Sequence, residues 1–282
     1  MNPQKIALIT DSSCDLSDEI LERYDIGLVP LRICFTDKTY RDRVELSGDR
    51  FYPMLEREIP KSSLPAAEDI TAAFDRAREK GYEKALFLTI SSGLSGTYQF
   101  VKMLAESYQG LEIHCMDTKI LSCGQGSLVV AAARVLQKGG SLEDAVRAVS
   151  SIRSRMSSFF VVQTLTYLSR GGRIGKVAGT VGSLLHLNPV ITVNNDGVYE
   201  TAAKTLGFAR ALDLLVKEVE SRFRGKKIVV SMVHALNEGD ASRILARVKG
   251  FADVMEASIT PVTAVLGAHT GPGLVGLIAY EA

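Results

Sequence analysis

The sequence has few of the residues that mark metal sites, disulfide-bonded folds and membrane spans. It contains only four cysteines, which form no CxxC pair and lie near no cluster of histidines. Neither a metal site nor a disulfide framework is therefore expected, and reduced thiols in the cytoplasm are the better interpretation. No apolar run approaches the roughly 20 residues of a membrane span. The start, MNPQKIALITDSS, has too short an apolar run for a signal peptide.

An excess of charge is also missing, as are the common motifs of nucleotide-binding and hydrolytic enzymes. The net charge is +1, which indicates neither a nucleic-acid-binding nor a membrane-surface protein. No GxxxxGK[ST] occurs, and RGGRIG lacks the spacing of a dinucleotide loop. GLSG is not the GxSxG elbow of α/β-hydrolases. The sequence therefore offers groups that hold an anion, but no recognised apparatus for breaking bonds.

The pattern of the first half, taken as residues 1–155, is typical of a parallel α/β sheet. Short apolar runs alternate with helical patterns and end in polar turns such as DSSCD. The expected strands are 5–10, 27–35, 85–90 and 111–116. The expected helices are 16–24, 49–58, 67–80, 96–108, 124–138 and 141–155.

The second half, residues 156–282, predicts a mixed α/β domain. FFVVQTL (159–165) is followed by a basic glycine-rich loop, SRGGRIGK. PVITVNNDGVYETA reads as a hairpin around Asp196-Gly197. Beyond it we expect helices at 208–223 and 239–250 and strands at 227–233, 253–259 and 274–280.

The turn SSGLSGT follows the strand expected at 85–90, where ligands of open α/β sheets bind. Ser95 is positioned to cap the next helix, which is a common role for serine. Its hydroxyl and the following backbone N–H groups are equally suited to an anion at the positive end of that helix. Both interpretations remain open.

His269 lies among the glycines of GAHTGPGLVG, which we expect to be a loop. An imidazole N–H there suits an anion, while the glycines alternatively serve only to turn the chain. The other histidines, His114, His186 and His234, are interpreted as structural. Arg170, Arg173 and Lys176 of SRGGRIGK form either a solvated basic loop or a contact for a carboxylate or phosphate.

Six stretches in the same order resemble the DegV family of bacterial lipid-binding proteins. They are TDSSCDL (10–16), VPL (29–31), KSSLP (61–65), ISSGLSGTY (90–98), TLTYLSRGGRIG (164–175) and AHTGPG (268–273). The resemblance implies a two-domain α/β fold, with a long-chain (palmitate-like) fatty acid held between the domains. It implies no enzyme, no cofactor and no metal. It implies instead a carrier, similar to the binding subunits of bacterial fatty acid kinase, that presents the acid to a separate ATP-dependent kinase subunit.

Carried over residue by residue, the resemblance places the fatty-acid carboxylate against Ser62, Ser95 and His269. Secondary contacts are expected from seven further residues: Ser63, Ser92, Gly96, Thr97, Arg173, Thr270 and Gly271. Two hydroxyls and an imidazole are the kind of donors a buried carboxylate requires. Apolar residues that are candidates either for the tunnel wall or for the ordinary core are Phe159, Leu165, Leu168, Ile174 and Leu184.

Three positions depart from the family pattern, and two other functions remain possible. Leu64 stands where the family has glutamine, Asn188 where it has lysine, and Leu206 where it has arginine. The first alternative function is a serine hydrolase of acyl esters with Ser95 as nucleophile and His269 as base. The second is a binder of another anion, such as a phosphorylated metabolite, without an apolar tunnel.

Overall fold

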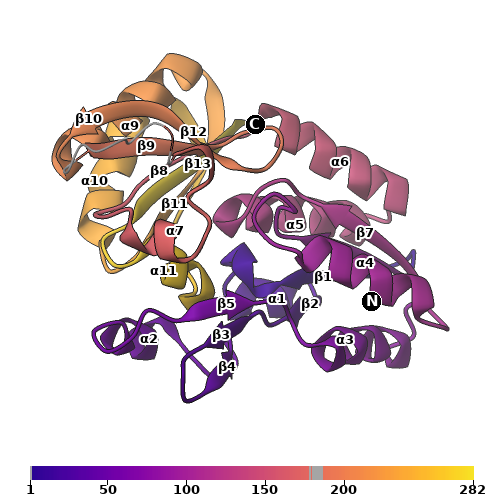
Figure 1. Cartoon of the computed structure of the whole chain (residues 1–282). Coiled ribbons are helices and arrows are strands. Elements are labelled where there is room, and N and C mark those ends of the chain that lie inside the picture. The colour runs from indigo at the N-terminus through magenta and orange to yellow at the C-terminus, as the bar shows by residue number, and fades with distance from the viewer. Residues whose placement is uncertain (1, 178, 180–186) are drawn as a thin grey trace.

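The computed structural model describes residues 2–177, 179 and 187–282. Leu184 and His186, named above, lie outside the described residues. Figure 1 shows a four-stranded and a six-stranded sheet on either side of the molecule, with a small three-stranded sheet below. This is the expected combination of a parallel and a mixed sheet. The boundary between residues 155 and 156 stays a prediction.

The four-stranded sheet is parallel throughout, with the order β2-β1-β6-β7. Its strands are β1 (Ile6–Asp11), β2 (Ile26–Val29), β6 (Lys84–Thr89) and β7 (Glu112–Asp117). The helices of this half are α1 (Asp18–Arg23), α3 (Ala67–Glu79), α4 (Thr97–Ser107), α5 (Ser122–Gln137) and α6 (Leu142–Arg155). Phe74 of α3 and Val101 of α4 pack against Ile9 and Phe87 on one face of the sheet. The other face packs against α5.

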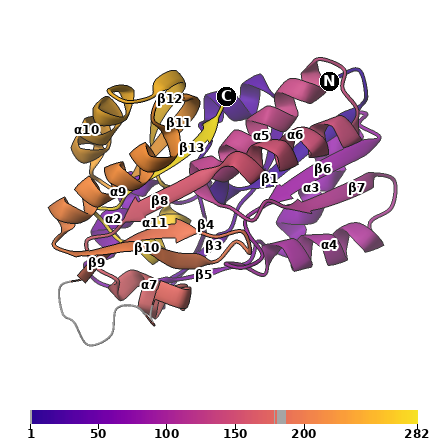
Figure 2. The same ribbon diagram turned by 90° about the horizontal axis from the view of Figure 1, so that it is seen from above.

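The six-stranded sheet has the order β10-β9-β8-β13-β11-β12 and is antiparallel except for the β11–β12 pair. Its strands are β8 (Ser157–Val161), β9 (Leu187–Val193), β10 (Tyr199–Leu206), β11 (Lys227–His234), β12 (Asp253–Pro261) and β13 (Val275–Glu281). Helices α9 (Phe208–Phe223) and α10 (Glu238–Lys249) cover one face, as Figure 2 shows from above. The predicted hairpin is present, with β9 and β10 paired around Gly197, whose φ is +79°.

The three-stranded antiparallel sheet lies at a place where the sequence predicted a single strand and loops. Its strands are β3 (Arg32–Cys34), β4 (Thr39–Arg41) and β5 (Lys61–Ser63). The short helix α2 (Gly48–Met54) lies between β4 and β5 in the chain. The strand expected at 27–35 is wrong as one element, because Pro30 has no N–H for a ladder and separates β2 from β3. The loop expected at KSSLP contains β5, which places Ser62 opposite Ile33.

The first four residues of the glycine-rich stretch GAHTGPGLVG are helical, and only residues 271–274 form the expected loop before β13. Helix α11 (Ala264–Thr270) contains both Gly267 and His269 and ends at Gly271, whose φ is +70°. A Cβ on Gly267 would lie 2.9 Å from the Tyr52 hydroxyl, so glycine lets α11 approach α2 closely. The shorter elements near the site are the 3₁₀ turn at Ser12–Cys14, α7 (Thr166–Arg170) and a 3₁₀ turn at Gly175–Val177.

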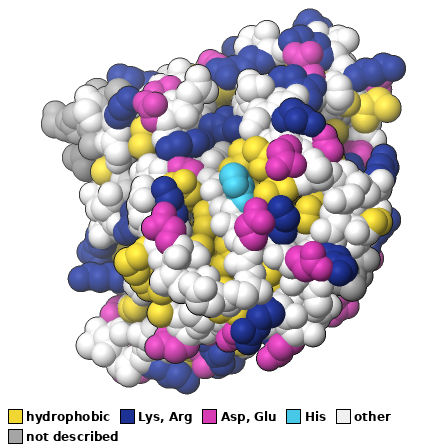
Figure 3. Space-filling model, turned by 90° about the vertical axis from the view of Figure 1, so that its right-hand side faces the viewer, with side chains coloured by type: hydrophobic (Ala, Val, Ile, Leu, Met, Phe, Trp, Pro, Cys, Tyr) yellow, Lys and Arg dark blue, Asp and Glu magenta, His cyan; other side chains and the backbone are white. Residues whose placement is uncertain are grey.

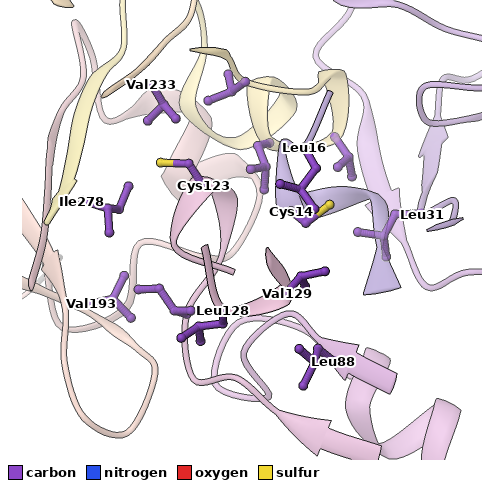
Figure 4. Close-up of a cluster of buried hydrophobic side chains, with 14 of the residues drawn as sticks. Cys14, Leu16, Leu31, Leu88, Cys123, Leu128, Val129, Val193, Val233 and Ile278 are labelled. Atoms are coloured by element: carbon purple, nitrogen blue, oxygen red, sulfur yellow. The ribbon is translucent and has the colours of Figure 1, made fainter. Parts of the chain in front are cut away.

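Helix α5 joins the two large sheets in one buried cluster. Figure 4 shows Cys123, Leu128 and Val129 of α5 among Leu88 of the parallel sheet and Val193, Val233 and Ile278 of the mixed sheet. All four cysteines are free, as expected for reduced thiols. Figure 3 shows one face of the surface, where positive and negative side chains are interspersed. Among the described residues, no helix is long and apolar enough to cross a membrane.

Candidate functional site

A cavity of about 280 Å³ lies where the two large sheets and the three-stranded sheet meet. Most of its wall is apolar and comes from both halves of the chain, for example Leu31, Ile90, Leu121, Phe160, Val193 and Ile278. Its polar wall includes all three residues expected to bind a carboxylate: Ser62, Ser95 and His269. An elongated apolar molecule with one polar end matches this distribution.

Ser62 and His269 meet directly, although they are 207 positions apart in the chain. The Ser62 Oγ lies 2.7 Å from the His269 Nε2. β5 presents the serine, and the last turn of α11 presents the imidazole. On the opposite side of the ring, a Cβ on Gly171 would lie 2.2 Å from the His269 Nδ1, so a glycine in SRGGRIG makes room for the histidine.

The surroundings of His269 keep its ring neutral near pH 7. Burial, together with the smaller effect of the nearby Arg173 guanidinium, lowers the pKa of His269 to about 4. Nδ1 is buried and has no hydrogen-bond partner in the described part of the chain. A neutral imidazole has one N–H donor and one acceptor nitrogen. The ring can therefore offer one hydrogen bond to a carboxylate without the cost of a buried cation.

Ser95 lies in the turn before α4 and lines the cavity. Its Oγ accepts the N–H of Thr97 at 3.3 Å and is 2.8 Å from the Thr97 Oγ1. The N-cap of α4 is Gly96 rather than Ser95, one residue later than the sequence predicted. Ser95 therefore both supports the first turn of α4 and faces the cavity, and neither of its two expected roles excludes the other.

Arg173 lines the cavity beside His269 and ties two loops together. Its Nε donates to the Leu94 carbonyl at 3.2 Å, and its Nη1 donates to the Gly171 carbonyl at 2.6 Å. These bonds join the turn that contains Ser95 to the turn that packs against His269. Arg173 is thus not merely a solvated residue of the basic loop.

The other expected contacts divide into two groups. Ser63 and Thr270 line the cavity, and Gly271 follows α11 with a φ of +70°. Ser92 and Thr97 are engaged elsewhere: the Ser92 Oγ accepts from Lys119 Nζ at 2.9 Å, and Thr97 supports Ser95. Gly96 is exposed beside Leu64, where an added Cβ would lie 3.5 Å from the leucine side chain.

Of the candidate tunnel residues, Phe159 lines the cavity, whereas three others pack in the core. Leu168 is fully buried in the core cluster, and Leu165 and Ile174 pack against it. Packing in the ordinary core was the alternative expectation for each of these residues. Periodicity does not separate the two environments, because both require an apolar side chain.

The remaining histidines differ in their surroundings. His234 is buried, and its Nδ1 accepts the N–H of Asn237 at 3.4 Å, in keeping with a structural role. The expectation of a packed His114 is wrong. β7 is the edge strand of its sheet, so this side chain is exposed.

The three departures from the family pattern take different positions. Leu64 lines the cavity mouth and is 37% exposed. The Asn188 side-chain amide donates to the Val162 carbonyl at 3.1 Å. Leu206 is exposed at the end of β10, away from the residues that line the cavity.

The sequence analysis missed several residues of the cavity wall. Tyr199 of the β9–β10 hairpin is buried in the wall, and the hydroxyl residues Ser122 and Ser158 add polar groups to it. Tyr199 stacks edge-on against Phe160, with 5.1 Å between ring centroids. The only sequence signal was the alternation along the hairpin, which does not distinguish a cavity from a core.

The contacts of His269 give no support to a serine hydrolase with Ser95 as nucleophile. The imidazole is hydrogen-bonded to Ser62, while the Ser95 hydroxyl is engaged with Thr97. In the described part of the chain no carboxylate orients Nδ1, the third part of the usual triad. The described residues also contain no group of three or more histidine, cysteine, aspartate or glutamate side chains placed to hold a metal ion.

Known proteins with the same sequence pattern and fold bind fatty acids. A DegV domain-containing protein of Clostridium acetobutylicum is 36% identical over 282 residues, which cover 99% of each chain. A DegV family protein of Thermus thermophilus, whose structure is described as showing fatty acid binding, covers all of both chains with 31% identity and a TM-score of 0.91. A stearic acid-binding protein of Eubacterium ventriosum covers 98% of each chain with 27% identity and a TM-score of 0.87.

The family model agrees with these individual similarities. The model that matches describes uncharacterised proteins of the DegV family and covers residues 5–282. This range includes all six stretches that first suggested the resemblance. The chain therefore belongs to the DegV family.

Proposed function

We propose that this protein binds one long-chain fatty acid in the cavity, with the carboxylate against Ser62, Ser95 and His269. The observation that carries the proposal is the Ser62–His269 contact of 2.7 Å in the wall of a cavity that is mostly apolar. The similar proteins of Thermus thermophilus and Eubacterium ventriosum bind fatty acids, which supports the same ligand class here.

The energetics favour a molecule with a long apolar chain and one acidic end. An unpaired carboxylate is very costly to bury, so it needs several donors at one end of the cavity. Two hydroxyls and an imidazole N–H supply them without a second buried charge. The chain contributes most of the affinity: about 15 methylene groups at ~0.8 kcal/mol each give roughly 12 kcal/mol before the costs of ordering and association.

Denaturing extraction of the purified protein followed by mass spectrometry tests the ligand class directly. We expect a long-chain fatty acid at close to one molecule per chain. A phosphorylated metabolite instead would favour the second alternative, binding of another anion. Protein that repeatedly contains neither, and that binds no added palmitate in calorimetry, would contradict the proposal.

We further propose that the protein presents the bound acid to a separate ATP-dependent kinase subunit. In that reaction a carboxylate oxygen attacks the γ-phosphorus of ATP, the bond to the bridging oxygen breaks, and acyl phosphate and ADP form. The reaction requires that the donors Ser62, Ser95 and His269 leave one carboxylate oxygen free for this attack. The proposal rests on the family resemblance. Acyl-phosphate formation from loaded protein, ATP and a fatty acid kinase catalytic subunit tests it, with lipid-free protein as the control.

A further inference from the structure

The turn DSSCD, residues 11–15, follows β1 at the edge of the sheet where a ligand was expected, yet it does not line the cavity in the described part of the chain. All five of its residues are buried, including the carboxylates of Asp11 and Asp15. Burying two carboxylates is costly, and such groups are retained where they make specific hydrogen bonds. The partners of this turn therefore indicate what it does.

The first partner is the segment that contains Ser95. The Asp11 Oδ2 accepts the backbone N–H of Ile90 at 2.7 Å. Ile90 begins the turn that leads to Ser95 and itself lines the cavity. Asp11 is in turn fixed by the Ser13 hydroxyl, which donates to its Oδ1 at 2.5 Å.

The second partner is the sheet that contains Ser62. The Ser12 Oγ accepts the backbone N–H of Leu31 at 3.1 Å. Leu31 immediately precedes β3, in which Ile33 pairs with Ser62. A displacement of Leu31 would therefore be passed to the strand that holds the serine hydroxyl.

The third partner is the helix that contains His269. The Asp15 Oδ1 accepts the backbone N–H of Thr263, the N-cap of α11, at 2.8 Å. The Ser122 hydroxyl holds the other oxygen of Asp15 at 2.5 Å. Asp42, next to the turn, accepts the N–H of Val265 at 3.2 Å in the first turn of the same helix.

We infer that the turn Asp11–Asp15 is the positioning element of the carboxylate site, because Asp11, Ser12 and Asp15 each hold one of the segments that carry Ser95, Ser62 and His269. The inference rests on the proposed function. Donors from three distant segments must meet one carboxylate within hydrogen-bond distance, and a single buried turn bonded to all three fixes their separation. None of these three turn residues contacts the ligand itself.

Comparing a fatty acid with its methyl ester separates positioning from general stability. The two molecules share the alkyl chain, but the ester lacks the charged group. We define the discrimination as the ratio of the affinity for palmitate to the affinity for methyl palmitate. A variant that only loosens the fold weakens both affinities alike and leaves the discrimination unchanged. A variant that displaces the donors lowers it.

For Asp15→Ala we expect the discrimination to fall about three- to ten-fold, less than the roughly ten-fold or greater loss expected for His269→Ala. Asp15→Asn keeps an acceptor for Thr263 and should restore most of the discrimination. In the His269→Ala background, Asp15→Ala should have no further effect. In the Ser95→Ala background, which serves as the matched control, it should retain its full effect.

Ser12→Ala provides a second test if Asp15→Ala does not fold, because it leaves both buried carboxylates in place. The Ser12 side chain also hydrogen-bonds Asp42, which holds the first turn of α11. The effect of Ser12→Ala should therefore be smaller in both the Ser62→Ala and the His269→Ala backgrounds and persist in full in the Ser95→Ala background. The inference would be overturned if Asp15→Ala and Ser12→Ala both kept the wild-type discrimination. It would also be overturned if each substitution had the same effect in every background. Wild-type protein that binds neither palmitate nor its ester, or does not distinguish them, would instead overturn the proposed function.

Discussion

The Ser62 Oγ and the His269 Nε2 lie 2.7 Å apart and join β5, an edge strand of the three-stranded sheet, to the end of α11. A carboxylate that reaches this pair must either share the bond or replace it. Its affinity therefore depends on both residues together. Before the ligand binds, this hydrogen bond also influences which ring nitrogen of His269 carries the proton, because a neutral imidazole has only one N–H.

The first prediction concerns the charge of His269. Without lipid its pKa is about 4 because of burial and Arg173. A carboxylate beside the ring favours the protonated form, so the pKa should be higher with bound palmitate. The bound state then holds the proton more tightly, and affinity should fall as pH rises from about 4 through the lipid-bound pKa. NMR titration of His269 with and without palmitate measures this, and identical titration in both states would exclude the imidazole as a carboxylate partner.

Ser95→Ala should weaken palmitate binding by about 1.5–3 kcal/mol, the usual value of a hydrogen bond to a charged group. Loss of the acceptor for Thr97 should also cost ~1 kcal/mol of stability. Calorimetry and thermal melting measure the two effects separately. Ser92→Ala is the matched control, since its hydroxyl bonds Lys119 instead. A lower melting temperature with unchanged affinity would mean that Ser95 only supports the helix.

Arg173→Ala separates holding the acid from presenting it. Removing the guanidinium frees the turn at Leu94 and also removes a cation that lowers the pKa of His269. We expect palmitate affinity to fall about ten-fold, as for loss of one charged hydrogen-bonding group. Acyl-phosphate formation should be measured at saturating palmitate, so that weaker binding does not limit it. Wild-type palmitate affinity and wild-type acyl-phosphate formation would show that Arg173 is needed for neither step.

Gly271→Ala should destabilise the protein more than Gly225→Ala. Both glycines have positive φ, +70° and +72°, which strains an alanine at either position. Gly271 also has a ψ of 178°, a combination that is almost restricted to glycine, so the backbone cost there should be about 1–3 kcal/mol. At Gly271 an added Cβ would also lie 2.3 Å from the Tyr167 ring, whereas nothing lies within 4 Å at Gly225. Chemical denaturation compares the two. Equal losses of stability would show that neither the backbone conformation of Gly271 nor the Tyr167 ring adds a cost.

Asp42→Asn should change how stability depends on pH. Burial raises the pKa of Asp42 to about 7 in the folded protein. A raised folded pKa means that this group stabilises the fold below its unfolded pKa of about 4, and that this stability is lost as pH rises to about 7. The variant should therefore gain stability relative to wild type between pH 4 and pH 8, by up to about 4 kcal/mol for a shift of about three pKa units. Denaturation curves of both proteins at pH 4 and pH 8 test this. The same difference in free energy of unfolding at the two pH values would contradict it.

Long elements with a clear pattern could be predicted from the sequence. The helix expected at 208–223 coincides with α9, and the hairpin around Asp196-Gly197 is present. Short elements that depend on distant partners could not. α11 has only seven residues, and a helix of that length is not stable by itself. It forms because its glycine packs against Tyr52 and its first turn is bonded to Asp15 and Asp42.

The candidate site could be predicted as a set of residues but not as a geometry. The resemblance selected Ser62, Ser95 and His269, and all three line one cavity. The local pattern contains no sign that Ser62 and His269 touch, since 207 positions separate them. It also cannot divide apolar residues between cavity and core, which is why Phe159 lines the cavity while Leu168 does not.

The bond between Asp15 and Thr263 spans 248 positions, and α11 ends only twelve residues before the end of the chain. During synthesis the N-terminal turn is therefore made long before its partner exists. Contacts of such large sequence separation form late and slowly in folding. The chain consequently becomes able to bind a carboxylate through His269 only after α11 has been made. A protein shortened before residue 263 would lose α11 and also β13, which lies between β8 and β11 in the six-stranded sheet.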